Sequence, residues 1–224
     1  AEIGKDHVAV TTLVGPDGDA HVYEPTPADA TGLAAADVLV VNGLDFETWL
    51  PRLVAASGFD GVEVVATTGV NPRAFADHDD ADHDHDAAEG EDHDEVATDD
   101  HDHEEGGHHH HGANDPHAWQ NLANGVIYAR NIAAALAAAD PDNAAAYEAN
   151  AAAYIASLEA LDAKVKAAFA AIPAERRKVV TSHDAFGYFA AAYGVEFIAP
   201  TGVSTEAEAS AADVAAIIDQ IKAD

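Results

Sequence analysis

Apolar runs of strand length alternate with helical patterns near the start of the chain. Residues 37–43 contain a continuous apolar run, the pattern of a strand that is buried on both faces of a parallel sheet. Residues 7–14 and 62–67 also favour strands, and residues 46–56 favour a helix. Another helix is predicted to begin at Thr26, which has the pattern of a helix N-cap. This alternation predicts βαβ units and a parallel sheet.

Two long helical patterns occupy the middle of the chain. The first covers residues 120–139 and ends at Asp140-Pro141. Apolar residues then recur at every third or fourth position as far as Pro173, so residues 140–172 predict one helix of about 45 Å. Its high alanine content favours a single rigid rod. A coiled-coil oligomerisation helix is the alternative, but only about four heptads are available and alanine makes a small knob.

Strand and helix patterns resume after Pro173. Residues 178–182 and 195–199 predict strands, residues 184–193 predict a short helix between them, and a final helix is predicted from Ser210. The predicted fold class is therefore α/β, with two βαβ (Rossmann-like) lobes joined by a long rigid spine helix.

The predicted division of the chain follows these patterns. The parts are an N-terminal lobe at residues 1–139, a spine helix at 140–172 and a C-terminal lobe at 173–224. The C-terminal lobe ends on a helix with no returning strand, so we expect it to be incomplete. The chain starts at Ala1 and contains no methionine, which fits a processed product.

Acidic residues dominate the charge of the chain. Asp and Glu number 41 against 10 Lys and Arg, which gives a net charge of −31. Such a surface repels phosphate backbones and anionic lipid, which argues against nucleic-acid and membrane-surface partners and suits cations. Because the chain has no cysteine, any metal must be held by nitrogen and oxygen ligands.

Ten of the fourteen histidines lie in one acidic segment, residues 77–112, which belongs to the N-terminal lobe. They are His78, His83, His85, His93, His101, His103, His108, His109, His110 and His111. On composition the segment is a solvated, disordered insertion, and imidazole alternating with carboxylate also suits capture of metal ions. We therefore predict a disordered loop with weak, secondary metal sites. A purification tag is an alternative for the run from His108 to His111.

Three further histidines, His21, His117 and His183, lie in predicted loops. Each follows or adjoins a predicted strand or opens a helix, and loops at the carboxyl ends of strands converge on one crevice in open α/β sheets. Any one of them alone is more often a structural histidine. Together they make a candidate metal site. His7, inside the first predicted strand, is interpreted as structural.

Three segments of the sequence resemble the metal-binding segments of a known family, the cluster A-I solute-binding proteins of ABC importers for zinc and manganese. They are residues 15–29 (GPDGDAHVYEPTPAD), 114–119 (NDPHAW) and 181–189 (TSHDAFGYF). The resemblance implies two α/β lobes joined by a rigid helix, with the metal in the cleft between the lobes and bound by His21, His117 and His183. It also implies a fourth ligand, an Asp or Glu expected beyond residue 224.

The resemblance favours zinc as the metal, Zn²⁺, because manganese proteins of the family tend to have glutamate in place of His183. Imidazole is also a better partner for Zn²⁺ than for the harder Mn²⁺. A histidine-rich insertion is likewise typical of the zinc branch, the ZnuA-like and AztC-like proteins. The implied function is high-affinity capture of periplasmic zinc for an ABC importer, with the membrane permease as partner. A periplasmic zinc donor (metallochaperone) is a further candidate partner. We expect an exported, periplasmic monomer without its signal peptide.

Three other functions remain open at this point. A manganese or other divalent-metal solute-binding protein would use the same cleft. A His₃ zinc enzyme would keep an open position for water beside a general acid or base, and the sequence has no H-E-x-x-H helix. A cytosolic metal store would bind zinc only in residues 77–112.

Overall fold

The computed structural model describes residues 1–16, 18–74, 114–198, 214–215, 218–219 and 222. The ten histidines of the 77–112 segment lie outside the described residues, and so does most of the helix predicted from Ser210. The elements of the first half are η1 Lys5–His7, α1 Pro27–Ala34, β1 Val38–Val41, α2 Leu50–Ser57 and β2 Val62–Val65. Those that follow are η2 Ala118–Gln120, α3 Leu122–Ala139, η3 Pro141–Asn143, α4 Ala144–Ala170, η4 Ala174–Arg176, β3 Lys178–Val180, α5 Gly187–Tyr193 and β4 Glu196–Ile198.

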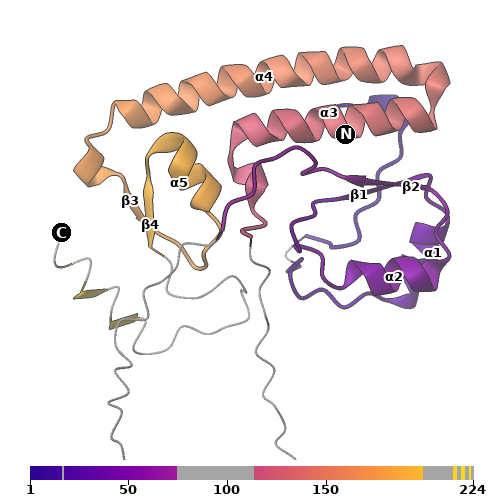
Figure 1. Ribbon diagram of the computed structural model, residues 1–224, viewed down its shortest axis with the longest axis horizontal. Helices are drawn as coiled ribbons and strands as arrows, with labels where there is room; N and C mark the ends of the chain where they lie inside the picture. The colour runs from indigo at the N-terminus through magenta and orange to yellow at the C-terminus, as the bar shows by residue number, and fades with distance from the viewer. Residues whose placement is uncertain (17, 75–113, 199–213, 216–217, 220–221, 223–224) are drawn as a thin grey trace, which may run out of the picture.

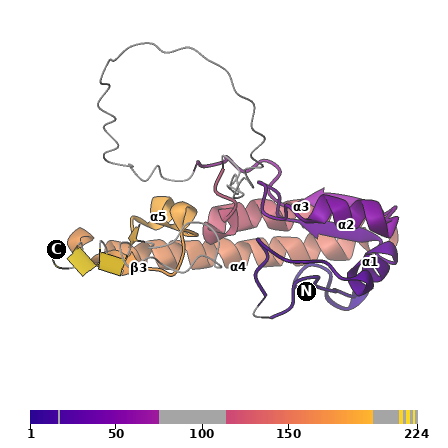
Figure 2. The same ribbon diagram turned by 90° about the horizontal axis from the view of Figure 1, so that it is seen from below.

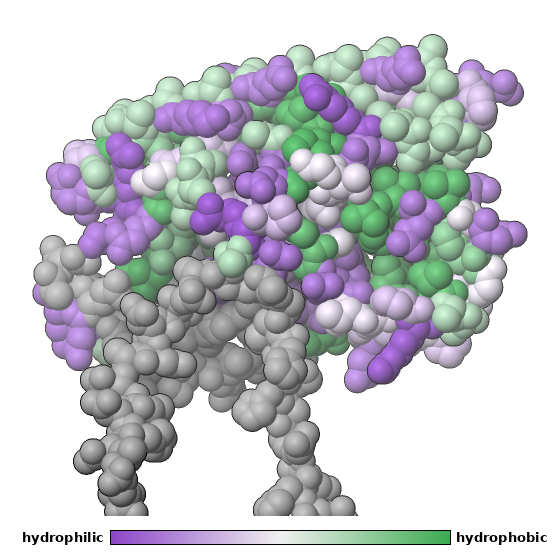
Figure 3. Space-filling model, in the orientation of Figure 1, coloured by the Kyte–Doolittle hydropathy of each residue, from purple (hydrophilic) through white to green (hydrophobic). Residues whose placement is uncertain are grey.

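The first half of the fold is a parallel pair of strands with helices packed on it. Strands β1 and β2 pair from Val38 with Val62 to Val41 with Val65. Leucines from α1, β1 and α2 share one hydrophobic core with Val41. Figure 3 shows hydrophobic side chains gathered over this half, and Val40 and Val62 of the two strands stay about half exposed, at 45% and 44%.

The strand predicted at residues 7–14 is wrong. The chain there forms the 3₁₀ turn η1 and then runs without regular structure, and no described strand pairs with it. Its alternating apolar residues are not all buried, because Val10 is 63% exposed. Because no strand of the described residues lies beside this segment, its backbone groups have no described β-ladder to join, and its strand propensity is not expressed. His7 therefore lies in η1, where its ring packs edge-on against Tyr147.

Helices α3 and α4 form an antiparallel hairpin that lies along both halves of the fold (Figures 1 and 2). The predicted rod begins at Ala144 instead of residue 140, because Asp140 turns the chain and accepts hydrogen bonds from Asn143 Nδ2 at 2.8 Å and the Tyr147 hydroxyl at 2.6 Å. These two bonds lower the pKa of Asp140. Alanines of α3 and α4 pack around Tyr147, the most deeply buried of the aromatic side chains described, so the rod is paired with a helix of its own chain.

Helix α3 has the length and apolar composition of a membrane span, with only 17% of that window buried. The core helices of soluble proteins can have the same length and composition, and two features favour the interpretation of α3 as a core helix. Its face toward α4 lies in the core. Asn131 on another face donates from Nδ2 to the carbonyl oxygens of Ala66 and Thr68, at 2.8 and 2.9 Å, just beyond β2.

The second half repeats the parallel arrangement on a smaller scale. Strands β3 and β4 pair from Lys178 with Glu196 to Val180 with Ile198, and α5 packs between them and α4. Aromatic rings take part in this contact: the Phe189 ring of α5 is edge-on to Phe169 of α4 and to Phe197 of β4. The predicted α/β fold class with one long helix is thus confirmed.

Candidate metal centre

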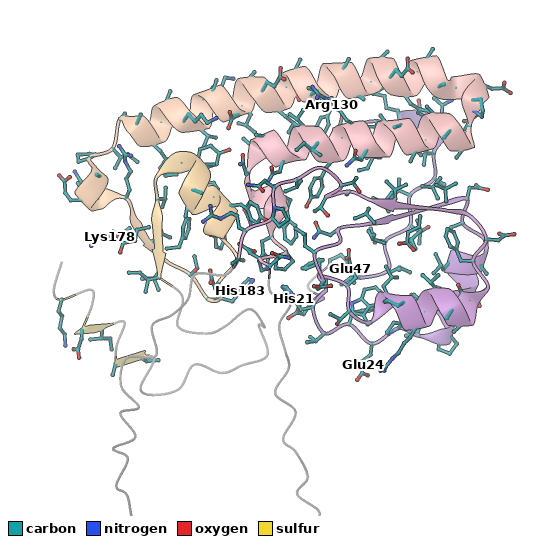
Figure 4. All side chains as sticks on the ribbon, in the orientation of Figure 1. His21, Glu24, Glu47, Arg130, Lys178 and His183 are labelled. Carbon is teal, nitrogen blue, oxygen red and sulfur yellow. The ribbon has the colours of Figure 1, made fainter. Side chains whose placement is uncertain are left out.

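His21, His117 and His183 converge on one point although they are far apart in the sequence. Their candidate ligand atoms all lie within 4.8 Å of one another, and the Nε2 atoms of His21 and His117 are 3.1 Å apart. Figure 4 shows His21 and His183 facing each other between the two halves of the fold. A zinc ion bonded to nitrogen at about 2.0–2.1 Å would need only a small closure of these rings. Among the described residues, no other group of potential metal ligands comes together in this way.

His117 is the most firmly held of the three histidines. Its side chain is almost completely buried, and its Nδ1 atom lies 2.7 Å from Oδ1 of Asp115, which is 3% exposed. The same oxygen accepts the backbone N–H of His117 at 2.9 Å, which makes a tight turn of residues 115–117. A carboxylate on one ring nitrogen fixes the tautomer, so that the other nitrogen, Nε2, presents its lone pair to a cation.

His21 is positioned by a similar turn and by the start of α1. Its backbone N–H donates to Oδ1 of Asp19 at 2.9 Å, and the Trp49 indole N–H donates to the carbonyl of Ala20 at 2.8 Å. The predicted N-cap is confirmed: the Thr26 hydroxyl accepts from the N–H of Asp29, and the Asp29 carboxylate accepts from the N–H of Thr26. This capping box fixes where the loop that carries His21 joins the helix.

His183 comes from the second half and follows β3. Its backbone carbonyl accepts a hydrogen bond from the hydroxyl of Thr181 at 3.1 Å. Burial lowers the pKa of His183, the nearby His117 lowers it further, and the negative charges of Asp19 and Asp184 oppose these effects. A lowered pKa keeps the imidazole neutral, which is the form that binds metal.

Asn42, at the end of β1, supports the His117 turn and was not singled out from the sequence. Its Nδ2 donates to the carbonyl of Pro116 at 2.9 Å, and its Oδ1 accepts from the Tyr128 hydroxyl at 2.6 Å. The end of β1 is thereby tied both to helix α3 and to the residue before His117. Burial raises the pKa of Tyr128, so its hydroxyl remains a donor.

Glu47 holds the turn that leaves β1. Its two carboxylate oxygens accept the backbone N–H groups of Asn42 at 2.7 Å and Gly43 at 3.2 Å. Burial raises the pKa of Glu47, and the two backbone bonds act in the opposite direction. Gly43, Leu44 and Asp45 all have left-handed backbone angles, with φ of 85°, 56° and 59°. Consecutive left-handed residues other than glycine are strained, so the hydrogen bonds of Glu47 stabilise a backbone conformation that is intrinsically unfavourable.

The strained turn places an aromatic ring against the histidines. The Phe46 ring lies 4.7 Å from that of His21 and 5.0 Å from that of Trp119, and Trp119 lies 5.3 Å from His117, all edge to face. These ring contacts restrict the orientations of both imidazoles. The sequence analysis did not predict that Phe46 and Trp119 contact the histidines. The Trp in the Asn-Asp-Pro-His-Ala-Trp segment was a signal that could have indicated the contact of Trp119.

The whole chain, residues 1–224, matches the model of one protein family, described as ZnuA, zinc-uptake complex component A, periplasmic. The chain belongs to the ZnuA family. The resemblance predicted from the three histidine segments is thus confirmed at the level of the family, together with the periplasmic location of its members.

Curated relatives of this ZnuA-family chain are named for several metals. The manganese ABC transporter substrate-binding lipoprotein PsaA of Streptococcus pneumoniae is 34% identical over 98% of this chain and 63% of its own length. The iron ABC transporter substrate-binding lipoprotein MtsA of Streptococcus pyogenes is 33% identical over the same shares. The chain therefore spans about 63% of the length of the curated relatives that it matches. These relatives are named as substrate-binding proteins, not as enzymes.

Solved structures of ZnuA type superpose on nearly all of the chain. A zinc-bound deletion mutant of ZnuA matches with a TM-score of 0.75 and 29% identity, over 99% of this chain and 71% of that one. A manganese-bound mutant of the periplasmic metal-binding protein from Candidatus Liberibacter asiaticus matches with a TM-score of 0.74 and 29% identity, over 99% and 71%. The fold is therefore shared by proteins whose structures were solved with different metals bound.

Proposed function

We propose that this protein captures Zn²⁺ in the periplasm with high affinity and delivers it to the membrane permease of an ABC importer. The observation that carries the proposal is the cluster of three imidazoles, whose ligand atoms lie within 4.8 Å of one another. Family membership supports the transport role, and the donor set supports zinc.

The donor set favours zinc over manganese for a physical reason. Imidazole is a borderline ligand that suits Zn²⁺, whereas Mn²⁺ prefers carboxylate, carbonyl and water. In the described part of the chain, the group of ligand atoms that come together contains nitrogen alone. The carboxylate of Asp115 contacts the far nitrogen of His117 and so strengthens an imidazole ligand without adding an oxygen to the cluster.

Manganese or another divalent metal is the second candidate cargo, because curated relatives are named for manganese and iron. A competition titration of the full chain separates the two. Zinc and manganese are each titrated against a chelator of known affinity, with the free metal buffered low enough to leave weak sites empty. We expect one tight zinc equivalent and a manganese affinity at least about 100-fold weaker, as the order of stabilities of divalent ions predicts. Equal affinities would make the protein a general divalent-metal carrier.

The architecture proposed with this function is two lobes, residues 1–139 and 173–224, around helix 140–172, with the cation between them. His21 and His117 come from the first lobe and His183 from the second, so a bound cation joins the two. The histidines of residues 77–112 are proposed as weak secondary sites that collect zinc near this cleft. A periplasmic zinc donor and a monomeric state belong to the same proposal, as does an Asp or Glu ligand from beyond residue 224.

A further inference from the structure

Helix α5, in the second half of the fold, packs against the segment of the first half that carries His117. It contacts η2, the short helix that begins one residue after His117 (Figure 1). The Tyr188 ring of α5 shares a buried hydrophobic cluster with Val70 and Ala118, and Ala118 is completely buried. The position of His117 therefore depends on α5 as well as on its own half of the fold.

Two hydrogen bonds in series also join α5 to Asp115, the carboxylate partner of the His117 ring. The Tyr188 hydroxyl accepts the backbone N–H of Arg73 at 3.0 Å. The carbonyl of Arg73 accepts the backbone N–H of Asp115 at 2.7 Å. The backbone of Arg73 therefore connects α5 to the turn that presents His117.

Gly187, the first residue of α5, leaves room for the Asp115 carboxylate. A Cβ atom at this position would lie only 2.7 Å from Oδ2 of Asp115, a separation that real Cβ atoms essentially never show. The backbone of Gly187 is not left-handed, so its conformation does not require glycine. Glycine is also a poor helix former. The close approach of the Asp115 carboxylate therefore accounts for glycine at the start of α5.

The Asp115 carboxylate has little freedom to move away from an added methyl group. Its Oδ1 lies 2.7 Å from the ring Nδ1 of His117 and accepts the backbone N–H of the same residue at 2.9 Å. Only 4% of its side chain is exposed. A rotation that takes Oδ2 away from α5 also turns Oδ1, and hydrogen bonds weaken steeply when their geometry is lost.

We infer that the start of α5 positions His117 from the other half of the fold: Gly187 admits the Asp115 carboxylate that holds the imidazole, and Tyr188 fixes the backbone beside it. The zinc-binding part of this inference rests on the proposed function. A displacement of the second half would move His183 and loosen His117 at the same time. The two halves are thus coupled through a ligand of each.

Gly187→Ala tests this role, because it adds one methyl group at the contact. Gly125→Ala in α3 is the matched control, since the new Cβ there would lie at an ordinary 3.6 Å from Cδ1 of Leu158. Zinc affinity is measured by chelator competition on the full chain. The ring nitrogens of His117 are observed by NMR without metal and assigned with His117→Ala, because the Nδ1 resonance reports the bond to Asp115.

We expect Gly187→Ala to weaken zinc binding by about tenfold, the lower end of the effect of losing a carboxylate that supports a ligating histidine. The Nδ1 resonance of His117 should shift in the same variant. Gly125→Ala should stay within about twofold of the wild-type affinity and leave the resonance in place. Wild-type zinc affinity in Gly187→Ala overturns the inference, and so does a lower affinity with an unchanged His117 resonance.

A double-mutant cycle with Asp115→Ala separates this role from a general effect on the fold. Asp115→Ala removes Oδ2, so adding Gly187→Ala should then weaken zinc binding by less than about twofold. An equal loss in both backgrounds would show that Gly187 does not act through Asp115, and the inference would be wrong.

Tyr188→Phe provides the test if Gly187→Ala does not fold. It keeps the ring and removes the acceptor of the Arg73 N–H, so zinc binding should weaken by about threefold, as the loss of one hydrogen bond predicts. Wild-type affinity in Tyr188→Phe would then overturn the inference. Failure of the proposed function looks different, because the wild-type chain would show no tight zinc equivalent.

Discussion

Replacing Asp115 by asparagine should weaken the zinc site through His117 without removing any ligand. Oδ1 of Asp115 receives both the ring Nδ1–H of His117 at 2.7 Å and its backbone N–H at 2.9 Å. Asparagine retains a carbonyl oxygen at this place, so the turn should survive. The ring bond changes from a charge-assisted bond to a neutral one, which is roughly half as strong.

The magnitude follows from burial and from the bond that is weakened. Both side chains are nearly fully buried, with exposed fractions of 2% for His117 and 4% for Asp115, so solvent cannot compensate for the weakened bond. Carboxylates that support a ligating histidine typically contribute 10–100-fold in metal affinity, or about 1.4–2.8 kcal/mol. In the metal-free protein, the weaker bond should also cost about 1 kcal/mol of the free energy of unfolding.

The assay is chelator competition for zinc on Asp115→Asn, with urea unfolding of the metal-free chain measured in parallel. Asp60→Asn is the control, because it makes the same chemical change at an exposed residue. Wild-type zinc affinity in Asp115→Asn would refute the argument that Asp115 tunes His117. Loss of folding would show instead that asparagine cannot keep the turn, and Asp115→Glu would then test whether a carboxylate restores zinc binding.

Three further predictions concern protons, the strained turn and the histidine-rich segment. Because the pKa of His183 is lowered below 6.5, its neutral, metal-binding form persists to more acidic pH. Zinc affinity should therefore hold above about pH 6.5 and decline below it. A loss of affinity already between pH 8 and 7 in an affinity titration would contradict this. Gly43→Ala should lower the melting temperature, because φ of Gly43 is +85° and the new Cβ would lie 2.6 Å from Cγ1 of Val65. Gly32→Ala in α1 is the control and should not lower it, because no atom lies within 4 Å of the new Cβ. A chain that lacks residues 77–112 should keep one tight zinc equivalent, lose the weaker equivalents and take up zinc more slowly from a loaded donor. Calorimetry measures the number of equivalents, and stopped-flow mixing measures the transfer rate. Loss of the tight zinc would contradict the cleft as the primary site.

The parts of the fold that were predicted correctly are those where local patterns and tertiary packing agree. The run at 38–41, the helix start at Thr26 and the long alanine-rich helix each satisfy both. The prediction of a strand at residues 7–14 was wrong. No described strand pairs with these residues, and the stability of a strand depends on pairing that a local sequence pattern does not reveal.

The convergence of the three candidate histidines was easier to predict than the residues that position them. His21, His117 and His183 carry strong local sequence signals, and the fold brings them together as expected. Asn42, Glu47 and Phe46 support the site through a turn with three consecutive left-handed residues, two of them not glycine. Leu44 and Asp45 rarely adopt left-handed backbone angles, so the sequence does not predict this turn. The contact of Phe46 with His21 that the turn produces therefore could not be predicted either.

The most direct test of the three-histidine site is a set of single alanine substitutions measured by zinc competition titration on the full chain. His21→Ala, His117→Ala and His183→Ala each remove one ligand, and His7→Ala is the matched control, since His7 is structured, packs on Tyr147 and lies outside the cluster. We predict that each of the three substitutions weakens the tight zinc equivalent by at least about 100-fold, while His7→Ala binds it as the wild type does. Wild-type affinity in any of the three would remove that histidine from the site and contradict a zinc centre built from all of them.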